Sequence, residues 1–187
     1  MKSKEAFGIF FRYFILLLLP LVNLWLFYYI FTPATVYPAY WILHKLIGAG
    51  PLINSYGNCS ESGAPAIFIK GYYSCIIGAC IAGAAYYFLT ILNLSTPMKI
   101  KKRIKSLLFM FSTFLILNIL RIVIFADLVY VGYKYFDITH QLVWYFGSTI
   151  LVVLVWFTNV LLFNINGVPI YTDVCALLRV IKSGGKK

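Results

Sequence analysis

SLLFMFSTFLILNILRIVIF, residues 106–125, is an apolar run long enough to cross a bilayer, and it contains an arginine, Arg121. A helix needs about 20 apolar residues to span the hydrocarbon core, and a charged side chain at its centre costs roughly 3 kcal/mol on insertion scales. Such a residue normally faces a protein interior or a water-filled cavity and serves a function. Arg121 therefore predicts a polar site inside a bundle of membrane helices.

The composition of the whole chain agrees with a membrane protein. Of 187 residues, 62% are hydrophobic and 11% are charged, which predicts a single all-α integral membrane domain over residues 1–187. A formal net charge of +11 would indicate nucleic-acid binding in a soluble chain. The basic residues here lie between apolar runs, where they act as topology signals, so we expect no nucleic-acid partner.

Four main transmembrane helices are predicted, at about residues 12–31, 73–94, 106–131 and 140–163. The first resembles a signal peptide, but its apolar stretch is too long and it lacks a small-residue cleavage site, so we predict a retained helix. Twelve lysines and arginines lie in the amino terminus, the loop after the second span and the tail, against three in the other loops. This asymmetry predicts that both termini are cytoplasmic.

The segments between and after the spans have their own patterns. Residues 32–72 are predicted to form an outer cap, with an interfacial helix at 35–47 and a short strand at 66–71. Residues 164–187 are predicted to form a cytoplasmic tail. Asn58-Cys59-Ser60 fits a glycosylation sequon, for which a plain polar turn is the alternative interpretation.

The second predicted span would begin with a cysteine on a small-residue face. Positions three, four and seven apart align on a helix. The face would consist of Cys75, Gly78, Ala79 and Ala82. Because three of these residues are small, a substrate helix could approach the thiol closely. Cys80 would lie about 140° round this helix at 100° per residue, so both cysteines could not point at one site.

Three chemically distinct side chains are predicted at one depth of the membrane. Cys75 and His140 begin the second and fourth spans on the outer side, and Arg121 lies about 22 Å along the third span from its cytoplasmic end. Asn118 precedes Arg121 by three residues and is its predicted hydrogen-bond partner. All three functional groups would therefore meet in the outer half of the membrane.

This combination indicates nucleophilic catalysis. A thiolate is the nucleophile, and a nearby arginine or protonated histidine lowers the thiol pKa from about 8.5. Histidine can pass a proton to the leaving amine, and arginine can stabilise an oxyanion. The four cysteines and two histidines show no metal-ligand spacing, so we predict neither a metal nor a cofactor.

These residues also carry a family resemblance. Cys75 with Gly78, then Asn118-Ile-Leu-Arg121, then His140 resembles the exosortase and archaeosortase family, over about residues 43–163. Family members are integral membrane cysteine transpeptidases, and the small chain resembles the archaeal branch more. The resemblance implies that Cys75 is the nucleophile, with Arg121 and His140 essential. The family usually has Cys-Ser-Gly or Cys-Thr-Gly, which differs from Cys75-Ile-Ile-Gly here, and Cys80 is the alternative nucleophile.

The resemblance also implies a substrate and a location. Family members recognise the carboxy-terminal sorting signal of a secreted protein, which consists of a short motif, a transmembrane helix and a basic cluster. They cut at the motif and pass the new carboxyl end to a lipid or another acceptor. The enzyme would lie in the plasma membrane, with its active site on the extracytoplasmic side.

Two other functions are compatible with the sequence. A membrane thiol-disulfide oxidoreductase could use Cys75 and Cys80, or Cys59, with a quinone, but this spacing is not Cys-x-x-Cys and leaves Arg121 without a role. A non-enzymatic transport or assembly subunit could use Arg121 to bind an anion or a partner's carboxylate. Cys59 and Cys175 have no assigned role and are predicted on opposite sides of the membrane.

Overall fold

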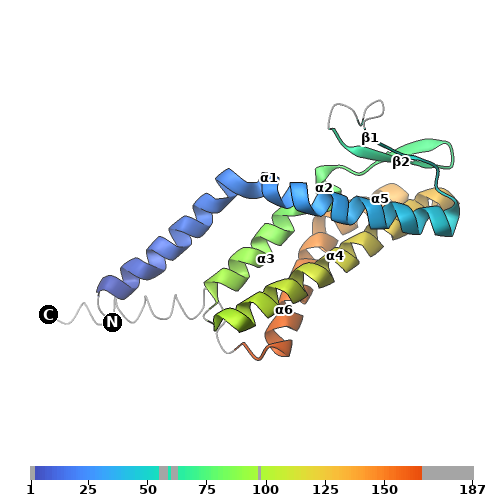
Figure 1. Cartoon of the computed structure of the whole chain (residues 1–187). Coiled ribbons are helices and arrows are strands. Elements are labelled where there is room, and N and C mark those ends of the chain that lie inside the picture. The colour runs from blue at the N-terminus through green and yellow to red at the C-terminus, as the bar shows by residue number, and fades with distance from the viewer. Residues whose placement is uncertain (1–2, 55–58, 60–62, 97, 166–187) are drawn as a thin grey trace.

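The computed structural model describes residues 3–54, 59, 63–96 and 98–165, of which 3–13 and 15–23 are described by their backbone alone. The chain is mostly helical, with one small sheet (Figure 1). In chain order the elements are α1 (Ser3–Ile47), β1 (Leu52–Asn54), β2 (Pro65–Ile69), β3 (Tyr72–Cys75), α2 (Gly78–Ile81), α3 (Gly83–Ser95), α4 (Ile100–Val131), α5 (Phe136–Leu142), the π-helical turn η2 (Val143–Gly147) and α6 (Ser148–Leu162).

Among the described residues, three helical segments are long and apolar enough to cross a membrane: Gly78–Ser95, Ile100–Val131 and Phe136–Leu162. They correspond to the second, third and fourth predicted spans. The first predicted span falls mostly in the part of α1 described by its backbone alone, so it stays a prediction, as does the orientation in the membrane. Asn58, Cys175 and all of the predicted tail after residue 165 lie outside the described residues.

The first span and the interfacial helix were predicted as separate elements, and this is wrong. α1 is continuous from Ser3 to Ile47, although Pro33 and Pro38 lie within it, and it bends part-way along (Figure 1). Its second half stays helical because Val36, Ala39 and Leu43 recur on one face and are buried in the core. The predicted interfacial helix is therefore part of the packed structure.

Aromatic rings hold α1, α3 and α4 together. Phe31 stacks on the fully buried Tyr86 with ring centroids 3.6 Å apart, and Phe111 meets both rings edge-on. Gly83 brings α3 close to α1, because a Cβ atom there would lie 2.8 Å from the ring of Tyr28. These contacts fix the first half of α3 against both α1 and α4.

The strand predicted at residues 66–71 is confirmed as β2, the middle strand of an antiparallel sheet in the order β1-β2-β3. The β2–β3 hairpin turns at Lys70 and Gly71, whose φ values of 48° and 90° suit a two-residue turn of type I′. The Lys70 amine donates a hydrogen bond of 2.9 Å to the carbonyl of Tyr130 in the last turn of α4. The hairpin tip is therefore fixed to α4.

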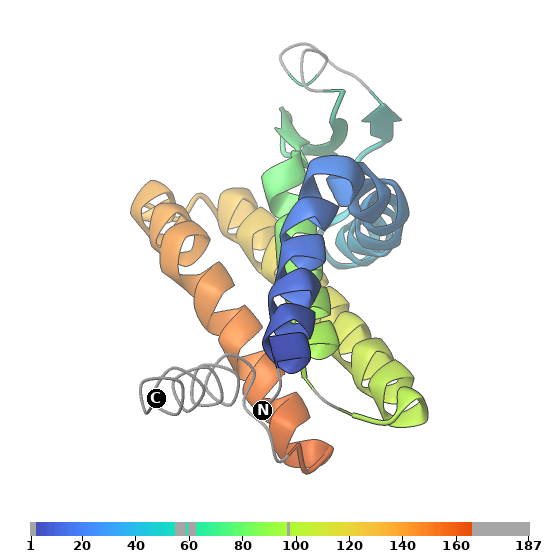
Figure 2. The same ribbon diagram turned by 90° about the vertical axis from the view of Figure 1, so that its left-hand side faces the viewer.

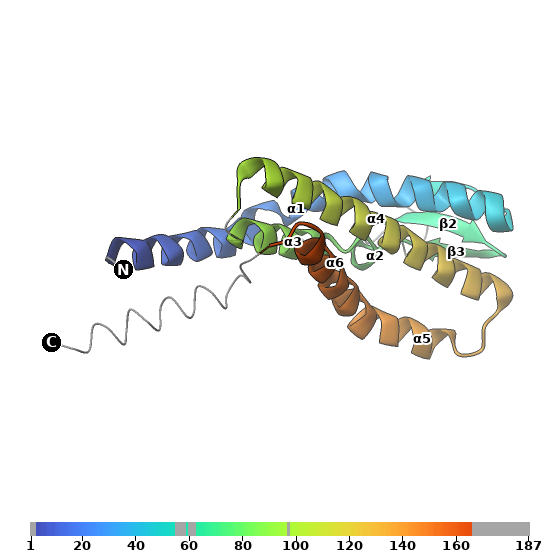
Figure 3. The ribbon, with the colours of Figure 1, turned by 90° about the horizontal axis from the view of Figure 1, so that it is seen from below.

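The sheet and the second half of α1 lie at one end of the helices (Figures 1 and 3). In Figure 2, α5 and α6 slant away from α1 and α3. α4 contacts both groups. A polar link crosses the opposite end. There the Asn93 amide donates to the Ser106 hydroxyl, which donates to the Asn159 side-chain oxygen.

Candidate active site

The second predicted span is not one helix, which corrects the prediction that Cys75 opens it. Residues Tyr72–Cys75 form β3, because pairing with β2 in the register Ala66↔Cys75 holds this segment extended. The helix begins at Gly78 and breaks after one turn at Ala82, whose φ of 58° is left-handed. α3 then continues from Gly83.

The small-residue face predicted for a substrate helix does not form as a single face. Cys75 is in a strand, and Ala82 occupies the break. Gly78 approaches the ring of Tyr28 on α1, at 3.4 Å from the position of an added Cβ atom. Ala79 lines a cavity instead. The four residues therefore lie in different environments, because the strand and the break interrupt the helical periodicity.

The break in the helix is supported by α4. A left-handed residue ends the hydrogen-bond ladder of α2, so the carbonyls before it need other donors. The Asn118 amide donates to the Cys80 carbonyl at 2.8 Å, and a guanidinium nitrogen of Arg121 reaches the same carbonyl at 3.5 Å. Asn118 was predicted to bond Arg121. Instead, both side chains share the carbonyl of Cys80.

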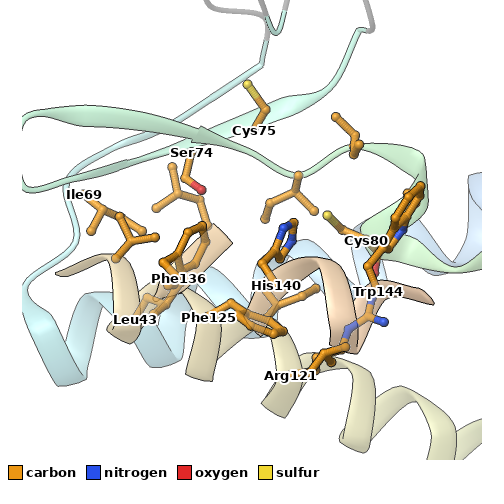
Figure 4. A pocket seen from close by; sticks show the side chains of 18 residues that line it. Leu43, Ile69, Ser74, Cys75, Cys80, Arg121, Phe125, Phe136, His140 and Trp144 are labelled. Carbon is orange, nitrogen blue, oxygen red and sulfur yellow. The ribbon is translucent and has the colours of Figure 1, made fainter. Parts of the chain in front are cut away.

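Cys75 and Cys80 have different chemical states. Cys75 is joined to Cys59 by a disulfide, whereas Cys80 is a free cysteine. Although Cys75 borders the cavity, its sulfur points away from it, while neighbouring Ser74 points inward, as alternation along a strand requires (Figure 4). A disulfide sulfur carries no thiolate, so Cys75 in this state cannot be the predicted nucleophile.

A cavity of about 320 Å³ lies between the sheet, α2, α4 and the α5–η2 segment. Its walls are mostly aliphatic and aromatic, and they include Ile67 and Ile69 of β2. Cys80, Arg121 and His140 supply a thiol, a guanidinium and an imidazole to this lining. In Figure 4 the Cys80 sulfur is directed toward the His140 ring, with the Arg121 guanidinium below it.

His140 is held by two aromatic rings. Its imidazole stacks on Phe136 with centroids 5.4 Å apart and an interplanar angle of 8°, and it meets Phe125 edge-on at 5.1 Å. Contacts on the ring face and the ring edge restrict the orientation of the imidazole. The side chain is nonetheless exposed, so its nitrogens are accessible from the cavity mouth.

Arg121 is half-buried and connects two elements through its guanidinium. One nitrogen reaches the Cys80 carbonyl, and another donates to the hydroxyl of Ser148 on α6. The guanidinium and the Cys80 thiol lie close enough to interact electrostatically. Asp127 is exposed, and the structure gives no ion pair between it and Arg121, although both residues are described.

Sequence reasoning missed Ser148, and no local signal marks it, because its contact with Arg121 crosses 27 positions. The disulfide had a signal, since Cys59 falls in the predicted outer segment and Cys75 at the outer start of the second predicted span, where the redox compartment permits pairing. Among the described residues, no group of three histidine, cysteine or acidic side chains could hold a metal ion.

No family model, curated protein or solved structure matches this chain. The resemblance to the exosortase and archaeosortase family therefore depends on the residues that carry it.

Proposed function

We propose that this chain is a membrane-embedded cysteine peptidase or transpeptidase in which Cys80 is the nucleophile. One observation carries the proposal: a free thiol, a guanidinium and an imidazole from three separate segments line one cavity. Cys80 replaces Cys75 in the role that the family resemblance implied. Arg121 and His140 keep their implied roles, and Asn118 supports the backbone that carries Cys80.

The chemistry proceeds in two balanced steps. Cys80 gives its thiol proton to His140, and the thiolate attacks the scissile carbonyl carbon, forming a C–S bond and an oxyanion. The guanidinium of Arg121, which reaches the backbone of Cys80, is the positive group that stabilises that charge. The C–N bond then breaks as His140 gives its proton to the leaving amine. In the second step an amine, a hydroxyl or water attacks the thioester carbonyl and gives its proton to His140, and the C–S bond breaks to release the Cys80 thiolate.

The substrate class follows from the family resemblance. We propose that the substrate is a secreted protein with a carboxy-terminal motif, transmembrane helix and basic cluster, and that the acceptor is a membrane lipid. The enzyme would then act in the plasma membrane, with the sheet end extracytoplasmic. A disulfide at the sheet end supports this side, because disulfides persist in oxidising compartments.

A thiol-disulfide oxidoreductase is the second candidate, and the Cys59–Cys75 disulfide is the observation that favours it. The disulfide sulfur of Cys75 and the thiol of Cys80 point in different directions, however (Figure 4). Direct exchange between them would require a rearrangement of β3. The oxidoreductase reaction also forms no oxyanion for Arg121 to stabilise.

The test is co-expression with a secreted protein that carries such a carboxy-terminal signal, chosen from the same genome. Intact mass is compared for the wild type, Cys80→Ala and the double variant Cys59→Ala/Cys75→Ala. We expect loss of the carboxy-terminal segment with the wild type and the double variant, and none with Cys80→Ala. A mass added to the product would identify the acceptor.

Other outcomes would reject specific parts of the proposal. Processing by Cys80→Ala at the wild-type level would exclude Cys80 as the nucleophile. Loss of processing in a folded double variant, with Cys80→Ala unaffected, would indicate that Cys75 is the nucleophile. If Cys80→Ala is harmless while Arg121→Ala abolishes the cellular phenotype of the chain, the non-enzymatic alternative gains support.

A further inference from the structure

Ser148 holds Arg121 through a different guanidinium nitrogen from the one that reaches the Cys80 carbonyl. A guanidinium nitrogen of Arg121 donates a hydrogen bond to the Ser148 hydroxyl. Ser148 is the first residue of α6 and follows η2 directly. It contacts the site through Arg121, and it is absent from the cavity lining.

The π-turn explains why Ser148 faces Arg121. Ser148 follows His140 by eight residues, and in a regular α-helix a position eight residues on lies about 80° round the axis, whereas one seven residues on lies about 20° away. η2 has wider i→i+5 turns, in which the Ser148 amide bonds to the Val143 carbonyl. Because the wider turn of η2 accommodates one extra residue, Ser148 lies on the same side of the helix as His140.

The half-buried position of Arg121 makes its hydrogen bond to Ser148 stabilising. A guanidinium has five N–H donors, and donors left unpaired away from water are costly. Two described partners of Arg121 are the Cys80 carbonyl on α2 and the Ser148 hydroxyl on α6. Without the Ser148 hydroxyl, the guanidinium loses one of these two hydrogen bonds. The flexible arginine side chain is then held less firmly beside the Cys80 thiol.

We infer that Ser148 is a positioning residue, which η2 places so that it fixes the Arg121 guanidinium against Cys80. For the chemical reaction this inference depends on the proposed function, but its effect on the Cys80 thiol does not. A positive charge close to a cysteine favours the thiolate, which reacts with alkylating agents. The reactivity of Cys80 therefore reports the position of Arg121 without any substrate.

The experiment measures the alkylation rate of Cys80 by iodoacetamide in the full-length protein in lipid nanodiscs. A Cys175→Ser background and an intact Cys59–Cys75 disulfide leave Cys80 as the free thiol. We expect Ser148→Ala to slow alkylation about threefold to tenfold at neutral pH. Ser148→Thr, which keeps the hydroxyl, should restore most of the rate.

A pH series distinguishes an effect on the ionisation of the Cys80 thiol from an effect on the access of iodoacetamide to it. At high pH, where the thiol is ionised in every variant, the rates of the wild type and Ser148→Ala should converge. A difference that persists at high pH would mean that the substitution changed access, and it would overturn the inference. Equal rates for Ser148→Ala and the wild type at neutral pH would overturn it as well, with Arg121→Ala as the reference for full loss of the charge.

Processing kinetics extend the test to the reaction. If the proposed function is correct, Ser148→Ala should lower kcat more than it changes KM, because an oxyanion needs the guanidinium chiefly in the transition state. Absence of processing by the wild type would reject the proposed function. The alkylation result would still decide whether Ser148 positions Arg121.

Discussion

Cys75 and Cys80 lie five positions apart and have different neighbours, which decide their chemistry. Cys75 is on the outward face of β3, where Cys59 bonds its sulfur. Cys80 is on α2, where its carbonyl accepts hydrogen bonds from Asn118 and Arg121 and its thiol stays free. The neighbouring sequence does not distinguish the two cysteines. Whether each sulfur is bonded or free therefore depends on its partner in the folded chain.

This difference predicts selective labelling. Without a reductant, iodoacetamide should modify Cys80 and leave Cys59 and Cys75 unmodified, because disulfide sulfurs do not react with it. Peptide mass spectrometry before and after reduction measures the labelled sites. Prior reduction should add both partners of the disulfide. Labelling of Cys75 in the unreduced protein would contradict the assignment and return Cys75 to consideration as the nucleophile.

At the scale of elements, η2 is the feature that shapes the site. It occupies the segment between His140 and Ser148, both of which face the region of Arg121. Gly147 makes the turn possible, since a Cβ atom at this position would lie 2.8 Å from Cγ1 of Val143. π-helical turns are rare and often occur at functional sites, which agrees with this location.

Gly147→Ala should therefore disturb the turn. Valine is stiff at χ1 in a helix, so the clash with Val143 is not relieved by rotation, and we expect a loss of about 1–3 kcal/mol in unfolding free energy. Cys80 alkylation should slow in the same direction as for Ser148→Ala. The double variant Gly147→Ala/Val143→Ala removes the clashing Cγ1 atom and should recover much of both losses.

Unfolding in detergent and the alkylation rate are the two measurements, and Val143→Ala alone is the matched control. If the double variant behaves like Gly147→Ala, the clash with Val143 is not the reason for the glycine.

At the scale of the whole molecule, the cavity lies at one end, which we call the site end. A buried hydrogen-bonded link lies at the other, which we call the supporting end. The sheet covers the cavity at one end, where Lys70 ties its hairpin to α4. At the other end, Ser106 links Asn93 on α3 to Asn159 on α6, and all three side chains are fully buried. Hydrogen bonds of this kind hold membrane helices together without a hydrophobic driving force.

Ser106→Ala should weaken the supporting end alone. It removes the shared partner of Asn93 and Asn159, so we expect a loss of about 0.5–2 kcal/mol in unfolding free energy, measured in detergent. Ser112→Ala, on the exposed side of the same helix, is the control and should have little effect. Cys80 alkylation should stay at the wild-type rate in both variants, and a marked change with Ser106→Ala would mean that the two ends are coupled.

Much of the scaffold could be predicted from local pattern. Three of the predicted spans correspond to helical segments of membrane length, and the strand at residues 66–71 is present as β2. These elements follow from runs of apolar residues and from β-propensity, which act over a few neighbouring positions. The arginine within the third span also indicated a polar site, and Arg121 lines the cavity together with His140.

The sequence by itself determined the membrane class, three apolar segments of membrane length and the presence of Arg121 and His140 on two of them. Only the tertiary structure decided which cysteine is free, that the second span breaks at Ala82, and that Ser148 meets Arg121. The physical reason is the range of the contacts. Strand pairing with β2, the disulfide to Cys59 and the contact between α4 and α6 join residues far apart in the chain, and helical periodicity carries no information about such partners.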